Sequence, residues 1–123
     1  MKKIIIKTGG KKWEATLNES ATALQVYNAL PITGMANLWG DEIYFSIPVD
    51  ADTAAGAMEE VEPGTLAYWP PGNAFCIFFG PTPASSSDKP KAASHVNILG
   101  NILSEVNGLK IIKEGAVIEI IAG

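Results

Sequence analysis

The most hydrophobic stretch of the chain, residues 75–79 (FCIFF), follows a rigid turn. All five residues are apolar, and Gly72 and Gly80 flank the run, which is too short for a typical helix. This pattern predicts a strand in the middle of a sheet, apolar on both faces. In the turn before it, Pro70 and Pro71 fix two φ angles and remove two backbone donors, and we expect Gly72 to supply a positive φ.

Alternating apolar and polar residues predict further strands. Residues 2–7 and 12–17 flank Gly9 and Gly10, which indicates a hairpin with a glycine turn. In residues 42–47, period two places Ile43, Phe45 and Ile47 on the core face. The other expected strands are residues 65–69, 75–79, 94–99 and 116–121, with residues 32–37 extended.

One segment has the spacing of a helix. Its apolar residues are Leu24, Val26, Tyr27 and Leu30. The helix is expected over residues 21–30, with Asn18 or Ser20 as its cap and Pro31 at its end. Residues 50–57 indicate a loop, residues 81–93 an irregular connection, and residues 102–106 a short helix or turn.

About eight strands, one helix and no repeated βαβ unit predict a mainly β fold. The closest architecture is a closed or nearly closed eight-stranded antiparallel barrel. With 123 residues, we expect one domain over residues 1–123. No apolar run approaches the roughly 18 residues that a membrane span needs, and residues 1–7 do not form a signal peptide. A cytoplasmic location without membrane association is therefore expected.

Charge narrows the set of partners. The net charge of −4 argues against nucleic acid, whose phosphates require clustered positive charge. All nine positive residues are lysines, so no guanidinium is available for a bidentate contact. Cys76 is the only cysteine and His95 the only histidine, which argues against a disulfide or a metal site. No cofactor motif is present, and exposed edge strands and aromatic surface are compatible with a homodimer.

Several motifs together resemble one family. They are residues 37–46 (NLWGDEIYFS), residues 68–80 (YWPPGNAFCIFFG), Thr82-Pro83 and residues 94–100 (SHVNILG). Over its whole length the chain resembles the small prokaryotic cyclophilin-like proteins, a group without assigned activity, and more distantly the cyclophilins. The resemblance implies a barrel, in agreement with the strand count.

Prolyl isomerase activity does not follow from this resemblance. Cyclophilins place an arginine near the prolyl amide, whose isomerisation barrier is about 20 kcal/mol, and this chain has no arginine. His95 lies five residues before Gly100, where the cyclophilin pattern has four, and a shift of one residue reverses the face of a strand side chain.

Aromatic residues gather in two of these motifs, beside the carboxylate of Glu42. The candidate binding residues are Trp39, Glu42, Tyr44, Tyr68, Trp69 and Phe78. Two interpretations stay open, core packing or a groove, because binding sites are mostly apolar with a few placed polar groups. Glu42 is either a solvated carboxylate at the strand end, or a carboxylate beside two aromatic side chains that has a raised pKa or contacts a cationic ligand.

Two functions from different classes are compatible with these residues. The first is a binding module for a small molecule or a proline-containing peptide, without efficient prolyl isomerase activity. The alternative is an enzyme, a weak prolyl isomerase or a hydrolase-like activity, with Glu42 and His95 as the catalytic candidates.

Overall fold

The structure, a computed structural model that describes residues 1–123, is built mainly from antiparallel strands. It contains one α-helix, α1 (Ala21–Asn28), and two 3₁₀ helices, η1 (Pro70–Gly72) and η2 (Asn107–Ile111). The strands are β1 (Lys2–Thr8), β2 (Lys11–Leu17), β3 (Ile32–Met35), β4 (Asn37–Leu38), β5 (Glu42–Ser46), β6 (Met58–Glu60), β7 (Thr65–Trp69), β8 (Ala74–Phe78), β9 (Lys91–Ile102) and β10 (Val117–Ala122).

The strands form one open sheet. Their order is β3-β10-β1-β2-β9-β7-β8-β5-β4, and β6 pairs with β9 outside this path. The edge strands β3 and β4 are separated in the chain by Ala36 alone, but no hydrogen-bonded ladder joins them. The mainly β, antiparallel prediction is therefore confirmed, whereas the closed eight-stranded barrel is not: the sheet has ten strands and does not close on itself.

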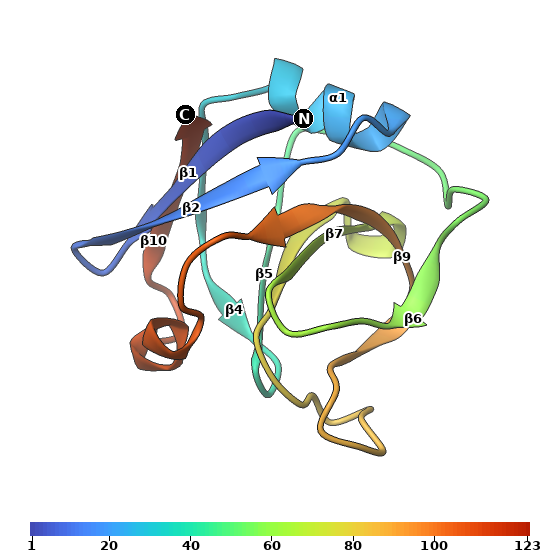
Figure 1. The fold of residues 1–123 in the computed structure, drawn as a ribbon, viewed down its shortest axis with the longest axis vertical. Helices are drawn as coiled ribbons and strands as arrows, with labels where there is room; N and C mark the ends of the chain where they lie inside the picture. The colour runs from blue at the N-terminus through green and yellow to red at the C-terminus, as the bar shows by residue number, and fades with distance from the viewer.

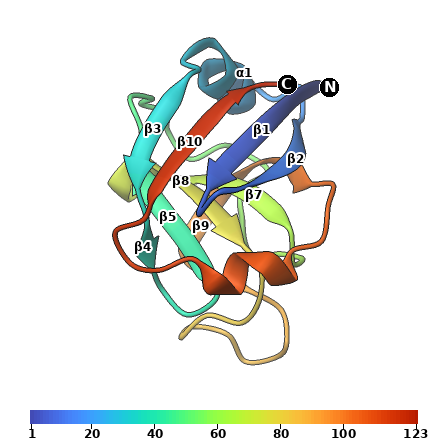
Figure 2. The same ribbon diagram turned by 90° about the vertical axis from the view of Figure 1, so that its left-hand side faces the viewer.

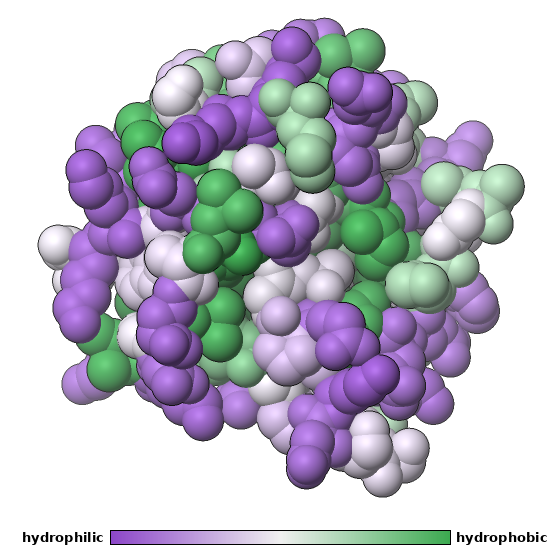
Figure 3. Space-filling view, in the orientation of Figure 1, coloured by the Kyte–Doolittle hydropathy of each residue, from purple (hydrophilic) through white to green (hydrophobic).

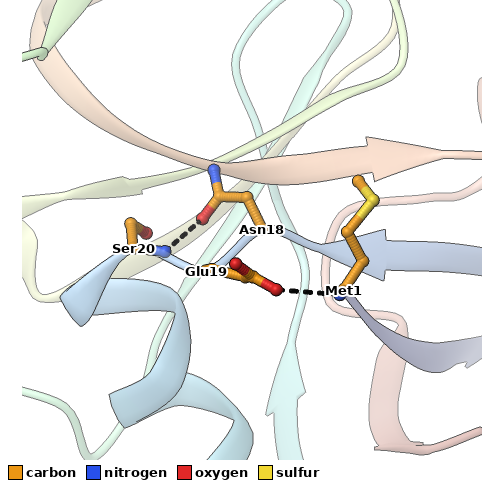
Figure 4. A network of polar contacts seen from close by, with 4 residues as sticks. All are labelled: Met1, Asn18, Glu19 and Ser20. Atoms are coloured by element: carbon orange, nitrogen blue, oxygen red, sulfur yellow. Dashed lines mark hydrogen bonds and ion pairs between the residues drawn. The ribbon is translucent and has the colours of Figure 1, made fainter.

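The helices α1 and η2 lie at opposite ends of the molecule, at the top and the bottom of Figure 2. Ser20 caps α1, because its Oγ accepts a hydrogen bond from the backbone N–H of Ala23 at 3.2 Å. Asn18 supports the cap, because its Oδ1 accepts from the N–H of Ser20 at 3.0 Å (Figure 4). The helix ends two residues earlier than predicted, since the residue before Pro31 is disfavoured in helical conformation.

The two faces of the sheet contribute to two separate hydrophobic clusters. The larger contains 24 buried residues, among them Ile43 and Phe45 of β5. The smaller contains seven, including Cys76 and Phe78 of β8, with Tyr44 packed against it. Residues next to each other in β5 thus point to opposite sides, and the predicted orientation of its aliphatic side chains is confirmed.

β9 is longer than the sequence indicates and connects three neighbours. It begins at Lys91, inside the stretch predicted as irregular, and pairs in turn with β6, β7 and β2 (Figure 1). Near its end Gly100 lies so close to β2 that a Cβ there would collide with the carbonyl oxygen of Thr16. The first half of β9 and the three-residue strand β6 form an arm beside β7. The sequence pattern does not predict β6.

The turn before β8 also differs in one detail. Asn73, not Gly72, has the positive φ, at 48°. Asparagine tolerates this left-handed conformation better than most residues, so glycine is not required there. The strand that follows is confirmed at Ala74–Phe78, with all five residues buried.

The surface is mixed in character. Figure 3 shows hydrophilic side chains over most of one face, with hydrophobic side chains exposed in separate patches between them. None of the helices has the length and apolar character that a membrane crossing requires.

Candidate functional site

A half-open cavity of about 200 Å³ lies between β5, β7 and the first half of β9. Six of its seven lining residues are hydrophobic, and the seventh is a glutamate. The lining residues are Trp39, Glu42, Tyr44, Trp69, Ala92, Ala93 and Val96. Such an apolar wall with one placed polar group is typical of small-molecule sites.

The β4–β5 hairpin positions three of these side chains. Trp39 and Glu42 close the turn through two backbone hydrogen bonds of 2.9 and 3.2 Å. Gly40 adopts a φ of 61° within the turn, which glycine does without strain. Because Glu42 and Tyr44 are two residues apart on β5, both side chains point to the face opposite Ile43 and into the cavity.

Trp69 links the sheet to the arm across the cavity. Its Nε1 donates a hydrogen bond of 2.7 Å to Ser94 Oγ on β9. Its ring also lies against Gly72, where a Cβ would be 2.9 Å from the ring carbon Cε3. These two contacts fix the orientation of the indole, so this part of the aromatic wall is preformed.

Glu42 is the only charged residue in the lining. Its exposed fraction is 6%, and no ion pair includes it. Burial raises the pKa of Glu42 from 4.5 to about 7, and the nearby thiol of Cys76 offsets part of this shift. Burial also raises the pKa of Cys76, and the neighbouring carboxyl raises it further. The cavity therefore holds a carboxyl that can gain or lose a proton near neutral pH.

The cavity brings together four of the six residues predicted to bind a ligand. Trp39, Glu42, Tyr44 and Trp69 line it. Tyr68 lies instead in the larger core, where its hydroxyl donates to the carbonyl of Val49 at 2.7 Å. Phe78 is fully buried in the smaller cluster and does not line the cavity.

The second catalytic candidate, His95, is not among the residues that line the cavity. Its side chain is 59% exposed on β9, and its Nδ1 lies 3.6 Å from a carboxylate oxygen of Glu59 on β6. It does not line the cavity with Glu42. No group of three or more histidine, cysteine, aspartate or glutamate side chains is arranged to hold a metal ion.

Sequence reasoning missed the contribution of β9. Ala92, Ala93 and Val96 form one wall of the cavity, and the first two lie in the segment predicted as irregular. The apolar residues Ala92 and Val96 are an even number of positions apart, which is the one signal of a strand face in this stretch.

Comparisons with known proteins give a consistent result. A family model described as cyclophilin-like matches residues 2–121. The solution structure of the hypothetical protein AF2241 from Archaeoglobus fulgidus is 38% identical, with a TM-score of 0.83 over 99% of this chain and 95% of that one. A structure of McbB in complex with tryptophan has a TM-score of 0.70 at 14% identity, over 97% of this chain and 44% of that one, which shows a shared fold. No curated protein matches the sequence significantly.

The raised pKa of Glu42 predicts a specific dependence of stability on pH. The folded protein holds the proton up to about pH 7, whereas the unfolded chain releases it near pH 4.5. The resulting stabilisation is complete below pH 4.5 and is lost as the pH rises through 7. At about 1.4 kcal/mol per pKa unit, the free energy of unfolding should fall by about 2–3 kcal/mol between pH 5 and pH 8 from this group.

Urea unfolding of Glu42→Gln at pH 5 and pH 8 measures this contribution, since glutamine does not ionise. The variant should lose less stability than the wild type by that amount. Glu14→Gln, which removes a carboxyl that is 56% exposed on β2, is the matched control and should follow the wild type. Parallel losses in the wild type and Glu42→Gln would contradict the assignment.

Proposed function

The chain belongs to the cyclophilin-like family, and from this premise we propose that it is a binding module for one small, largely apolar molecule in the cavity around Glu42 and Tyr44. The observation that carries the proposal is the composition of the wall, in which three aromatic rings and one buried carboxyl converge. A buried carboxyl in an apolar wall is unfavourable for folding, so its presence fits a role in recognition.

The size of the cavity limits the ligand. Cavities for drug-sized molecules measure about 300–1,000 Å³, whereas this one measures about 200 Å³. It accommodates a single ring or a short branched chain. A proline ring of a peptide has similar dimensions, and peptide binding is therefore one outcome that the experiment below distinguishes.

Efficient prolyl isomerisation is not part of the proposal. The chain has no arginine, and no lysine lines the cavity, so no cationic side chain is available there to stabilise a twisted prolyl amide. The wall offers hydrophobic contact and one exchangeable proton, which suit binding better than this reaction.

A second candidate follows from the proton on Glu42. General acid–base catalysis is most efficient when the pKa of the catalytic group lies near the working pH, as that of Glu42 does. A Glu42-dependent enzyme, without participation of the exposed His95, is therefore the alternative.

Fragment binding observed by NMR tests the proposed function. The probes are a panel of neutral, anionic and cationic fragments and a short proline-containing peptide. Binders should shift the amide signals of Ala92, Ala93 and Val96. Tyr44→Ala should weaken them about tenfold, as expected for loss of one aromatic contact worth about 1–1.5 kcal/mol.

Tyr27→Ala is the matched control for this variant, because Tyr27 lies on α1, outside the cavity, and stacks with Lys2. Its binding should equal that of the wild type. Absence of any binder, or shifts that do not concentrate on the cavity, would refute the proposed function. Binding of the peptide alone would replace the small molecule with a peptide ligand.

A prolyl isomerisation assay tests whether the second candidate is a prolyl isomerase. Uncatalysed exchange takes tens to hundreds of seconds, and we expect the protein to leave this rate unchanged. Acceleration that is lost in Glu42→Gln and retained in His95→Ala would instead establish Glu42 as a catalytic acid or base.

A further inference from the structure

Glu42 lacks the cationic partner that buried carboxylates usually have. The ion pairs of the protein join Met1 to Glu19, Lys3 to Glu14, Lys89 to Glu62 and His95 to Glu59. All of these carboxylates are more exposed than that of Glu42, which is 6% exposed and faces the cavity. A buried negative charge without a partner is unfavourable. A cation that enters the cavity supplies this partner, so its binding is favoured.

The rings around Glu42 favour the same charge. Trp39, Tyr44 and Trp69 line the cavity together with small aliphatic side chains. The face of an aromatic ring carries negative electrostatic potential and attracts an ammonium group, with tryptophan the most effective. The three rings and the carboxylate therefore all attract a bound cation.

No other group of the wall opposes this preference. On β8 the titratable neighbour is Cys76, which burial keeps as a neutral thiol by raising its pKa. In the turn between β4 and β5, the side chain of Asp41 lies against Gly80. The titratable residues in the first half of β9, Lys91 and His95, do not line the cavity, and β7 contributes only Trp69.

Building on the proposed function, we propose that the ligand is an organic ammonium whose charged nitrogen lies beside the Glu42 carboxylate and whose alkyl groups contact Trp39, Tyr44 and Trp69. An anion would meet the carboxylate and the net charge of −4. A metal ion would lack ligands, since Glu42 is the only carboxylate of the lining.

The proton on Glu42 links this ligand to pH. A cation binds the ionised carboxylate, so its affinity increases as the pH rises through 7. A neutral ligand that accepts a hydrogen bond from the protonated carboxyl has the opposite dependence. The sign of the pH effect therefore separates the two modes of binding.

Choline and 3,3-dimethylbutan-1-ol are a matched pair of probes, because they have the same shape and differ in charge. We expect choline to bind to the wild type at least tenfold more tightly than the alcohol at pH 8, in line with a cation–π contribution of about 2 kcal/mol at a desolvated site. Its affinity should also increase several-fold from pH 6 to pH 8. Titration followed by NMR of the cavity amides measures both quantities.

Substitution of Glu42 tests whether its carboxylate is responsible for the tighter binding of choline and for its dependence on pH. Glu42→Gln should reduce the preference for choline, because only the three rings remain to attract the cation, and should abolish its dependence on pH, whereas the surface variant Glu14→Gln should retain both. The comparison of the two probes and of the two pH values needs no variant, so the inference stays testable if Glu42→Gln does not fold.

The outcomes distinguish this inference from the proposed function. Equal affinity for the two probes, or tighter choline binding at pH 6 than at pH 8, would overturn the ammonium ligand and leave the binding module intact. Failure of both probes while other fragments occupy the cavity would have the same meaning. Failure of the probes and of the whole fragment panel would overturn both.

Discussion

The register between β5 and β8 is the constraint on which the core and the cavity both depend. Glu42 lies opposite Phe78 and Tyr44 opposite Cys76, whereas Ile43 pairs with Ile77 on the other face. Because side chains alternate along a strand, a shift of one residue in β5 would place the carboxyl of Glu42 in the larger core. The hydrophobic pattern that secures the core therefore also determines which side chains reach the ligand.

Burial of Glu42 connects stability to binding. The same desolvation that raises its pKa leaves a carboxyl ready to interact with a ligand, and the larger core of 24 buried residues supports the fold around it. The hydrogen bond from Trp69 to Ser94 joins β7 to the first half of β9 beside the cavity. The site is thus preorganised by contacts that also hold the arm in place.

Local pattern was sufficient to predict much of the fold. The β1–β2 hairpin, the position of α1 and the orientation of Ile43 and Phe45 depend on neighbours in sequence, which periodicity reports. Whether the two ends of the sheet form a ladder depends on contacts far apart in the chain. The open sheet and the arm formed by β6 and β9 could not be predicted for that reason.

Local pattern was likewise sufficient to predict only a part of the candidate site. Glu42 and Tyr44 share a face by period two, and so could be assigned together. Tyr68 and Trp69 are adjacent on β7 and therefore point to opposite sides, so only Trp69 lines the cavity. The Ala92 and Val96 wall depends on how β9 folds over the sheet, and the small residues before His95 gave little indication of a strand.

Both the pH dependence of stability and the proposed binding rest on Glu42, a buried carboxyl whose proton exchanges near neutral pH within the cavity. A ¹³C NMR titration of the Glu42 side-chain carboxyl in the folded protein, assigned by comparison with Glu42→Gln, tests it most directly. We predict a midpoint near pH 7. A midpoint near 4.5, the ordinary value for glutamate, would contradict it.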